Sequence, residues 1–257
     1  MKTIVLTGGA NGIGRAIVEQ MADQVNLYVM DIDEEAGKRV TEKLATKNLH
    51  FFYGDLAEKS HLDDFIGFVR KQTEKIDGII HNAAINHGGL VSQASLEDFM
   101  EVLRVNVGTA YYLTQQFEPC LSQEASIILL SSTRNHQSMP NDESYSSSKG
   151  ALLSLTHAMA NSLKGKARVN AISPGWIDTI SDQSYEERDA LSHEDLSQHL
   201  VNRVGNPLDI VHMVDYLLDA QKSGFITGQE FVVDGGMSKQ MVYHGENGWV
   251  YETDAHH

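Results

Sequence analysis

The sequence predicts one doubly wound α/β domain, in which helices cover both faces of a seven-stranded parallel sheet. The first observation is that short aliphatic runs alternate with longer segments of helical periodicity between residues 2 and 233. The second is that five of these runs end at residues suited to ligand binding or catalysis, namely Gly8 to Gly14, Asp31, Asn82, Ser132 and Pro174. In a doubly wound sheet such ends lie together on the edge where ligands bind. We expect residues 1–236 to form the domain and residues 237–257 to form an aromatic-rich C-terminal tail.

Length and composition narrow the class of protein. The 257 residues suffice for one large domain, and a hydrophobic content of 41% allows a sizeable core. The formal net charge of −15 argues against nucleic-acid and anionic-membrane partners, because no basic stripe exists to neutralise phosphates. The single cysteine, Cys120, excludes an internal disulfide and favours a cytoplasmic location. We expect no signal peptide, no membrane span and, from the scattered histidines, no metal site.

The first expected strand, residues 2–6, leads into a glycine-rich turn with the spacing G-x-x-x-G-x-G, and a helical pattern follows. Glycine lets the backbone come close to a ligand, and the N-terminus of a helix favours phosphate. We therefore expect this turn to bind a dinucleotide through Gly8, Asn11, Gly12, Ile13 and Gly14.

The second expected strand, residues 26–30, ends at Asp31, which Ile32 follows. An acidic side chain at this place accepts hydrogen bonds from the ribose hydroxyls of NAD and repels the additional phosphate of NADP. Because neither Asn11 nor the residues just after Asp31 offer a cation for that phosphate, we expect NAD(H) to be preferred over NADP(H). Asp31 also suits the cap of the helix expected at residues 34–45.

Residues 49–53 and 77–81 are the third and fourth expected strands. Asp55 and Leu56, after the third, are candidates for contact with adenine, although Asp55 equally suits the cap of a helix that starts near residue 60. After the fourth strand, small residues let the chain pass beneath an adenosine ribose, in the segment Asn82, Ala83 and Ala84.

A long helix is expected at residues 96–117, with Asn106 midway among apolar neighbours. A buried amide is unfavourable unless its hydrogen bonds are made, so Asn106 should have a specific partner.

The fifth expected strand, residues 126–130, leads to Ser132, and the helix after the next loop carries Tyr145 and Lys149. These two residues are four apart and share a helix face. A nearby cation favours the phenolate and lowers the pKa of Tyr145 from about 10, which suits proton transfer. Taken alone, the pair fits a solvated helix face equally well.

The sixth expected strand, residues 168–172, is followed by Pro174, Gly175, Ile177 and Thr179. The polar segment 180–206 then breaks the alternation, as a lid over a site would. A helix at residues 207–218 and a seventh strand at residues 230–233 complete the domain.

With these residues in place, the chain resembles the short-chain dehydrogenase/reductase family in its ordinary-length branch, which has a Rossmann-type fold. The resemblance extends from about residue 3 to residue 236 and departs in one respect, since His81-Asn82-Ala83-Ala84 stands where the family usually has Asn-Asn-Ala-Gly. The matching motifs are Thr7-Gly8, Gly12-Ile13-Gly14, Asp55, Asn82-Ala83-Ala84, Asn106, Ser132, Tyr145, Lys149, Pro174-Gly175 and Thr179.

The resemblance implies an NAD(H)-dependent oxidoreductase that interconverts a secondary alcohol and a ketone. Tyr145 is implied to be the general acid/base, and Ser132, thirteen residues earlier, to hydrogen-bond the substrate oxygen. Lys149 is implied to bind the nicotinamide ribose and to lower the pKa of Tyr145, while Asn106 holds a water that relays protons.

Further implications concern the cofactor and the assembly. The nicotinamide carboxamide is implied to bind the Ile177 backbone and the Thr179 hydroxyl. A homotetramer, or a homodimer, is implied, with the helices near residues 96–117 and 145–163 at one interface.

Two alternative functions fit the same fold type: a non-catalytic dinucleotide-binding or sensor protein, and an extended-chain epimerase or dehydratase. The few residues after Gly236 leave too little chain for the second of these.

The substrate is the least determined part. Candidates to contact it are Arg134, Asn135, His136 and Trp176, although Asn135 and His136 equally suit a structural turn. A polar rim with a tryptophan suits a sugar, a polyol or a steroid-like hydroxy compound. Arg134 also suits a carboxylate.

Overall fold

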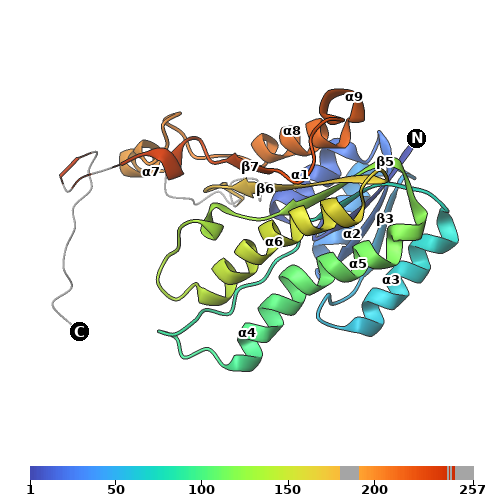
Figure 1. Cartoon of the computed structure of the whole chain (residues 1–257), viewed down its shortest axis with the longest axis horizontal. Helices are drawn as coiled ribbons and strands as arrows, with labels where there is room; N and C mark the ends of the chain where they lie inside the picture. Colours follow the sequence, from blue (N-terminus) through green and yellow to red (C-terminus); the bar gives the residue numbers. More distant parts are fainter. Residues whose placement is uncertain (180–190, 242, 244, 247–257) are drawn as a thin grey trace.

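The computed structural model describes residues 1–179, 191–241, 243, 245 and 246. Its centre is one seven-stranded parallel sheet, as the sequence predicts, and the structure gives the strand order β3-β2-β1-β4-β5-β6-β7 (Figure 1). The direction in which the chain progresses across the sheet reverses between β1 and β4. The segments that follow these two strands therefore leave in opposite directions, and a crevice forms between them, as at other topological switch points. The strands are β1 (Lys2–Thr7), β2 (Val25–Asp31), β3 (Leu49–Tyr53), β4 (Ile76–His81), β5 (Leu121–Leu130), β6 (Ala167–Pro174) and β7 (Glu230–Val233).

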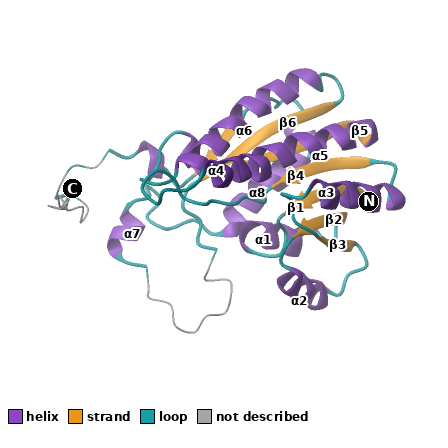
Figure 2. Cartoon of the chain, turned by 90° about the horizontal axis from the view of Figure 1, so that it is seen from below, coloured by secondary structure: helices purple, strands orange, loops and turns teal. Residues whose placement is uncertain are grey.

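Helices lie on both faces of the sheet, as Figure 2 shows. On one face lie α1 (Gly12–Met21), α2 (Glu34–Leu44) and α8 (Pro207–Leu218). The short α9 (Ala220–Ser223) follows α8 and lies beside it (Figure 1). On the other face lie α3 (Lys59–Gln72), α4 (Leu96–Leu103), α5 (Thr109–Phe117) and α6 (Glu143–Ser162). None of the helices within the described residues is long and apolar enough to cross a membrane.

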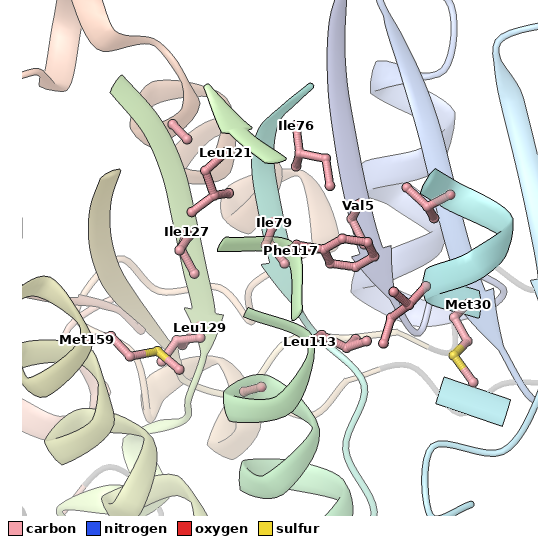
Figure 3. Close-up of a cluster of buried hydrophobic side chains, with 14 of the residues drawn as sticks. Val5, Met30, Ile76, Ile79, Leu113, Phe117, Leu121, Ile127, Leu129 and Met159 are labelled. Carbon is pink, nitrogen blue, oxygen red and sulfur yellow. The ribbon is translucent and has the colours of Figure 1, made fainter. Parts of the chain in front are cut away.

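Each face of the sheet has its own hydrophobic core, because side chains alternate along a strand. On β1, Val5 packs towards α3, α5 and α6, whereas Ile4 and Leu6 pack towards α1 and α8. Figure 3 shows Val5 in the first core, together with Phe117 of α5. Burial on both faces explains why the strands appear in the sequence as continuous apolar runs.

The helix expected at residues 96–117 is not continuous, which corrects the prediction. A π-helical turn, Arg104–Gly108, separates α4 from α5 and contains Asn106. The Asn106 side chain bonds the backbone of Ile85, beyond the end of β4. Such π-helical turns are rare and frequently lie at functional sites.

The expected lid is described only in part, since residues 180–190 lie outside the described residues. Within its remainder, α7 (His193–Ser197) begins at a capping box formed by Ser192 and Asp195. The chain then runs beside the segments that follow β6 and β7, because a parallel bridge pairs Ile177 with Gly205 and Val201 N donates to Gly235 O. Of the tail, only residues 237–241, 243, 245 and 246 are described.

Candidate active site

The glycine turn after β1 closes tightly over the ends of β1 and β4. Gly8 has a φ of +74°, and a Cβ there would lie 2.8 Å from Ala83 Cα. Asn82 Nδ2 donates to Gly8 O at 2.6 Å. A Cβ on Gly14 would lie 1.7 Å from the same Gly8 oxygen. Both positions therefore require glycine, the first for its backbone conformation and the second for the close approach of α1.

Asp31, at the end of β2, stabilises the glycine turn through hydrogen bonds to its carboxylate. Its Oδ2 accepts from Ala10 N at 2.8 Å and its Oδ1 accepts from Asp33 N at 2.9 Å. The alternative that Asp31 caps α2 is wrong, because Asp33 is the cap and accepts from Ala36 N. Asn11 donates to Asp33 rather than capping α1, which has no side-chain cap at its N-terminus.

A cavity of about 430 Å³ lies beside the glycine turn, in the crevice between β1 and β4. It brings together half of the residues expected to bind a dinucleotide, namely Gly8, Asn11, Asp31, Ile32, Asp55, Leu56, Asn82, Ala83 and Ala84. Gly12, Ile13 and Gly14 are the first residues of α1 and do not line it. Three apolar residues of its wall were not predicted, because no local sequence signal marks them: Met30, Ile85 and Val105.

Asp55 does not cap α3. Its Oδ1 accepts from Ala57 N at 2.8 Å, in a local turn before the helix, and the N-cap of α3 is Glu58. The capping alternative is therefore wrong, and Asp55 stays beside the cavity.

A second cavity, of about 560 Å³, contains the candidate chemical groups. Ser132, at the end of β5, and Tyr145, in the first turn of α6, both line it, and so do Gly175, Trp176 and Ile177 after β6. Thr179 lies against the glycine turn, because a Cβ on Gly12 would be 3.3 Å from its methyl carbon. The segment after β6 therefore reaches from one cavity towards the other.

Asn135 and His136 do not line this cavity. They belong to a 3₁₀ turn and its C-cap, and both side chains bond the carboxylate of Glu230 on β7. The Asn135 Nδ2–Glu230 Oε1 distance is 2.6 Å, and the His136 Nε2–Glu230 Oε2 distance is 2.9 Å. Asn135 and His136 therefore belong to a structural turn, which was the alternative to substrate contact.

Lys149 is almost fully buried, with 2% of its surface exposed. Its Nζ donates to Leu130 O at 2.8 Å and lies 5.2 Å from the centre of the Tyr145 ring. Burial lowers the pKa of Lys149 to about 7, because the charged amine is poorly solvated.

The pKa of Tyr145 is raised from its ordinary value, which is the opposite of the expected direction. Burial is the largest cause, and it outweighs the hydrogen bond from Ser132 and the charge of Arg134, which both lower the pKa. Lys149 is not among the causes, since its own charged form is disfavoured at the same depth.

Asn106 has the specific partner that its burial requires, as predicted. Its Oδ1 accepts from Ile85 N at 2.8 Å, and its Nδ2 donates to Ile85 O at 3.0 Å and to Ser148 Oγ at 2.9 Å. Ser148 Oγ in turn donates to Tyr145 O at 2.7 Å. Asn106 thus ties the π-helical turn to the chain beyond β4 and to the helix that carries Tyr145.

Asp142, which precedes α6, is 4% exposed and lines the second cavity, was not predicted as a site residue. Its position three residues before Tyr145 could have indicated it, but an acidic residue there is equally explained by the start of a helix. The other residues of the wall that were missed are Thr133, Gln137, Ser138, Met139 and Met237. Among the residues that the structure describes, no group of three or more histidine, cysteine or carboxylate side chains is placed to hold a metal ion.

Comparison with known proteins agrees with this architecture. A family model described as Enoyl-(Acyl carrier protein) reductase matches residues 8–238. An uncharacterized oxidoreductase of Thermotoga maritima is 39% identical over 254 residues, which cover 94% of this chain and 98% of that protein. An apo SCOR enzyme from Clostridium thermocellum is 34% identical, with a TM-score of 0.88, over 98% of this chain and 99% of the other.

A 3-ketoacyl-(acyl-carrier-protein) reductase from Brucella melitensis, solved in complex with NADH, is 25% identical with a TM-score of 0.80, over 92% of this chain and 98% of the other. Matches that cover nearly the whole chain at these identities establish the family. The chain belongs to the short-chain dehydrogenase/reductase family, whose members are oxidoreductases that act on alcohols and ketones with NAD(H) or NADP(H).

Proposed function

We propose that this chain is an NAD(H)-dependent oxidoreductase that interconverts a secondary alcohol and a ketone. The observation that carries the proposal is that Ser132 and Tyr145 face one cavity while the glycine turn and Asp31 face an adjoining one. The N-terminus of α1 has no side-chain cap, so its backbone N–H groups suit a pyrophosphate. When bound, the nicotinamide supplies the hydride chemistry.

Side chains of the protein transfer the proton to and from the substrate oxygen and stabilise the negative charge that develops on it. Tyr145 gives a proton to that oxygen during reduction and takes it back during oxidation. Ser132 donates a second hydrogen bond to it, which stabilises the negative charge that develops there. Lys149 is proposed to bind the nicotinamide ribose, and Asn106 to hold a water that relays protons.

The test is the variant Tyr145→Phe, which removes the hydroxyl and keeps the ring. We expect turnover to fall by at least 100-fold, the range general acid–base catalysis provides, while the dissociation constant for NADH, measured by fluorescence, changes little. Wild-type turnover in the variant would refute the mechanism. A wild-type protein that binds NADH but oxidises it with no carbonyl compound would support the alternative, a non-catalytic dinucleotide sensor.

The preference for NAD(H) is proposed from the charges beside the first cavity. Asp31 and Asp33 stand at the end of β2, and the cavity wall includes no lysine or arginine among the described residues. A ribose 2′-phosphate would face these carboxylates without a cation. We expect kcat/KM to be higher for NADH than for NADPH, and Asp31→Ser to reduce the ratio. Equal values for wild type would remove this part of the proposal.

The remaining proposals concern substrate, assembly and location. A wall that combines Trp176 and Ile177 with polar side chains suits a sugar, a polyol or a steroid-like hydroxy compound. An NAD-coupled screen over such alcohols, read at 340 nm, selects among them.

A homotetramer or homodimer is proposed from the family, and light scattering tests it. Free Cys120 suits a reducing cytoplasm, and cell fractionation tests this location.

A further inference from the structure

Two charged side chains meet in the wall of the second cavity. Arg134 follows Ser132 in the 3₁₀ turn, and Asp142 immediately precedes α6. Arg134 Nη1 forms an ion pair with Asp142 Oδ2, in which 34% of the arginine side chain and 6% of the aspartate side chain are exposed. The other oxygen, Asp142 Oδ1, accepts from Asn86 Nδ2 at 2.7 Å. Both oxygens of this buried carboxylate are therefore occupied by groups of the protein.

No other charged side chain lines this cavity among the described residues. The cavity therefore contains one positive and one negative charge, and the rest of its polar wall is neutral. The pair lies close enough to Tyr145 to act on the pKa of the phenol: after burial and the Ser132 hydrogen bond, Arg134 lowers that pKa and Asp142 raises it.

A carboxylate or phosphate on a substrate would meet this pair unfavourably. If it takes the place of Asp142 on Arg134, it leaves a buried carboxylate without its cation, which is strongly destabilised. If the pair stays intact, the anion lies beside Asp142 and is repelled. A neutral hydroxyl, amide or carbonyl meets neither difficulty, because it forms hydrogen bonds with the pair as it stands.

We propose that the Arg134–Asp142 pair restricts the site to uncharged alcohols and ketones, with Asp142 as the residue that excludes anionic substrates. This inference rests on the proposed oxidoreductase function and specifies its substrate class. Arg134, an apparent carboxylate ligand in the sequence, is committed to a carboxylate of the protein itself.

The test uses acetoacetamide and acetoacetate, which match in size and differ in charge. For wild type with NADH we expect kcat/KM to be at least tenfold higher for the amide. Asp142→Asn keeps the size of the side chain and its contact with Asn86 but removes the charge that neutralises Arg134. It should raise kcat/KM for acetoacetate at least tenfold, and the double variant Asp142→Asn/Arg134→Gln should reverse that gain.

The same comparisons are made as dissociation constants on NADH-saturated protein, so that the inference is tested even if neither ketone is reduced. Absent turnover with an intact preference for the amide would count against the proposed function alone. Circular dichroism and the melting temperature check that each variant is folded. The inference is overturned if wild type binds acetoacetate as well as acetoacetamide, if Asp142→Asn gains no affinity for acetoacetate, or if none of the proteins binds either ketone.

Discussion

Replacing Lys149 with methionine should stabilise the folded chain at neutral pH and remove a dependence of its stability on pH. An unfolded lysine holds its proton up to a pKa of about 10.4, whereas burial lowers the pKa of Lys149 to about 7 in the folded chain. Between these values unfolding takes up a proton, so the free energy of unfolding rises with pH. Below pH 7 the lysine is charged in both states, and the full cost of burying the charge remains.

The magnitude follows from the two pKa values. At 1.36 kcal/mol per pKa unit, the difference corresponds to about 5 kcal/mol against the buried charge. Between pH 7 and pH 9 about 2 kcal/mol of that cost is relieved. Methionine keeps the apolar stem but deprives Leu130 O of a hydrogen bond at 2.8 Å, which costs about 1–3 kcal/mol. The variant should therefore be more stable than wild type by about 2 kcal/mol at pH 7 and about equally stable at pH 9.

The assay is urea unfolding of both proteins at pH 7, 8 and 9, at one protein concentration and without added nucleotide. Groups that titrate in both proteins cancel in the difference between them. Lys164→Met, at an exposed lysine just after α6, is the control and should give a difference that does not vary with pH. A Lys149→Met difference that stays constant from pH 7 to pH 9 would refute the reasoning, because it would mean that the buried amine does not titrate in this range.

Two further predictions concern the frame of the site. Gly14→Ala forces a methyl group towards Gly8 O, from which a Cβ would be 1.7 Å away; the glycine turn must open, so the dissociation constant for NADH should rise at least tenfold and the free energy of unfolding should fall by about 1–3 kcal/mol. Gly67→Ala, in α3 with nothing within 4 Å of the added carbon, is the control and should not weaken NADH binding; equal effects of the two variants would contradict the prediction. Glu230→Ala removes the acceptor of Ser173 Oγ and Asn135 Nδ2 and should lower the free energy of unfolding by about 2 kcal/mol in urea. Glu230→Gln keeps one acceptor oxygen and should recover part of this loss, and an unchanged stability in the alanine variant would show that the cluster contributes nothing.

Much of the fold and of the site is determined by local sequence. The strands and most helices follow from hydrophobic periodicity, because burial on two faces demands apolar runs and burial on one face demands helical spacing. The positions of Asp31 and Ser132, at the carboxyl ends of β2 and β5, follow as well. A residue that directly follows a parallel strand lies at the same edge of the sheet as the others, whichever order the strands take.

The tertiary structure decided which groups are joined across that edge. Hydrogen bonds join Asn135 to Glu230 and Asn106 to Ile85, and in each case the two residues are far apart in sequence. Asn106 lies in the π-helical turn, which the hydrophobic periodicity of the sequence does not predict. The direction in which the pKa of Tyr145 is displaced depends on burial rather than on the spacing of four from Lys149. Local sequence specifies which side chains reach the site, but their partners and solvation depend on packing between distant segments, and these determine the charge that each side chain carries.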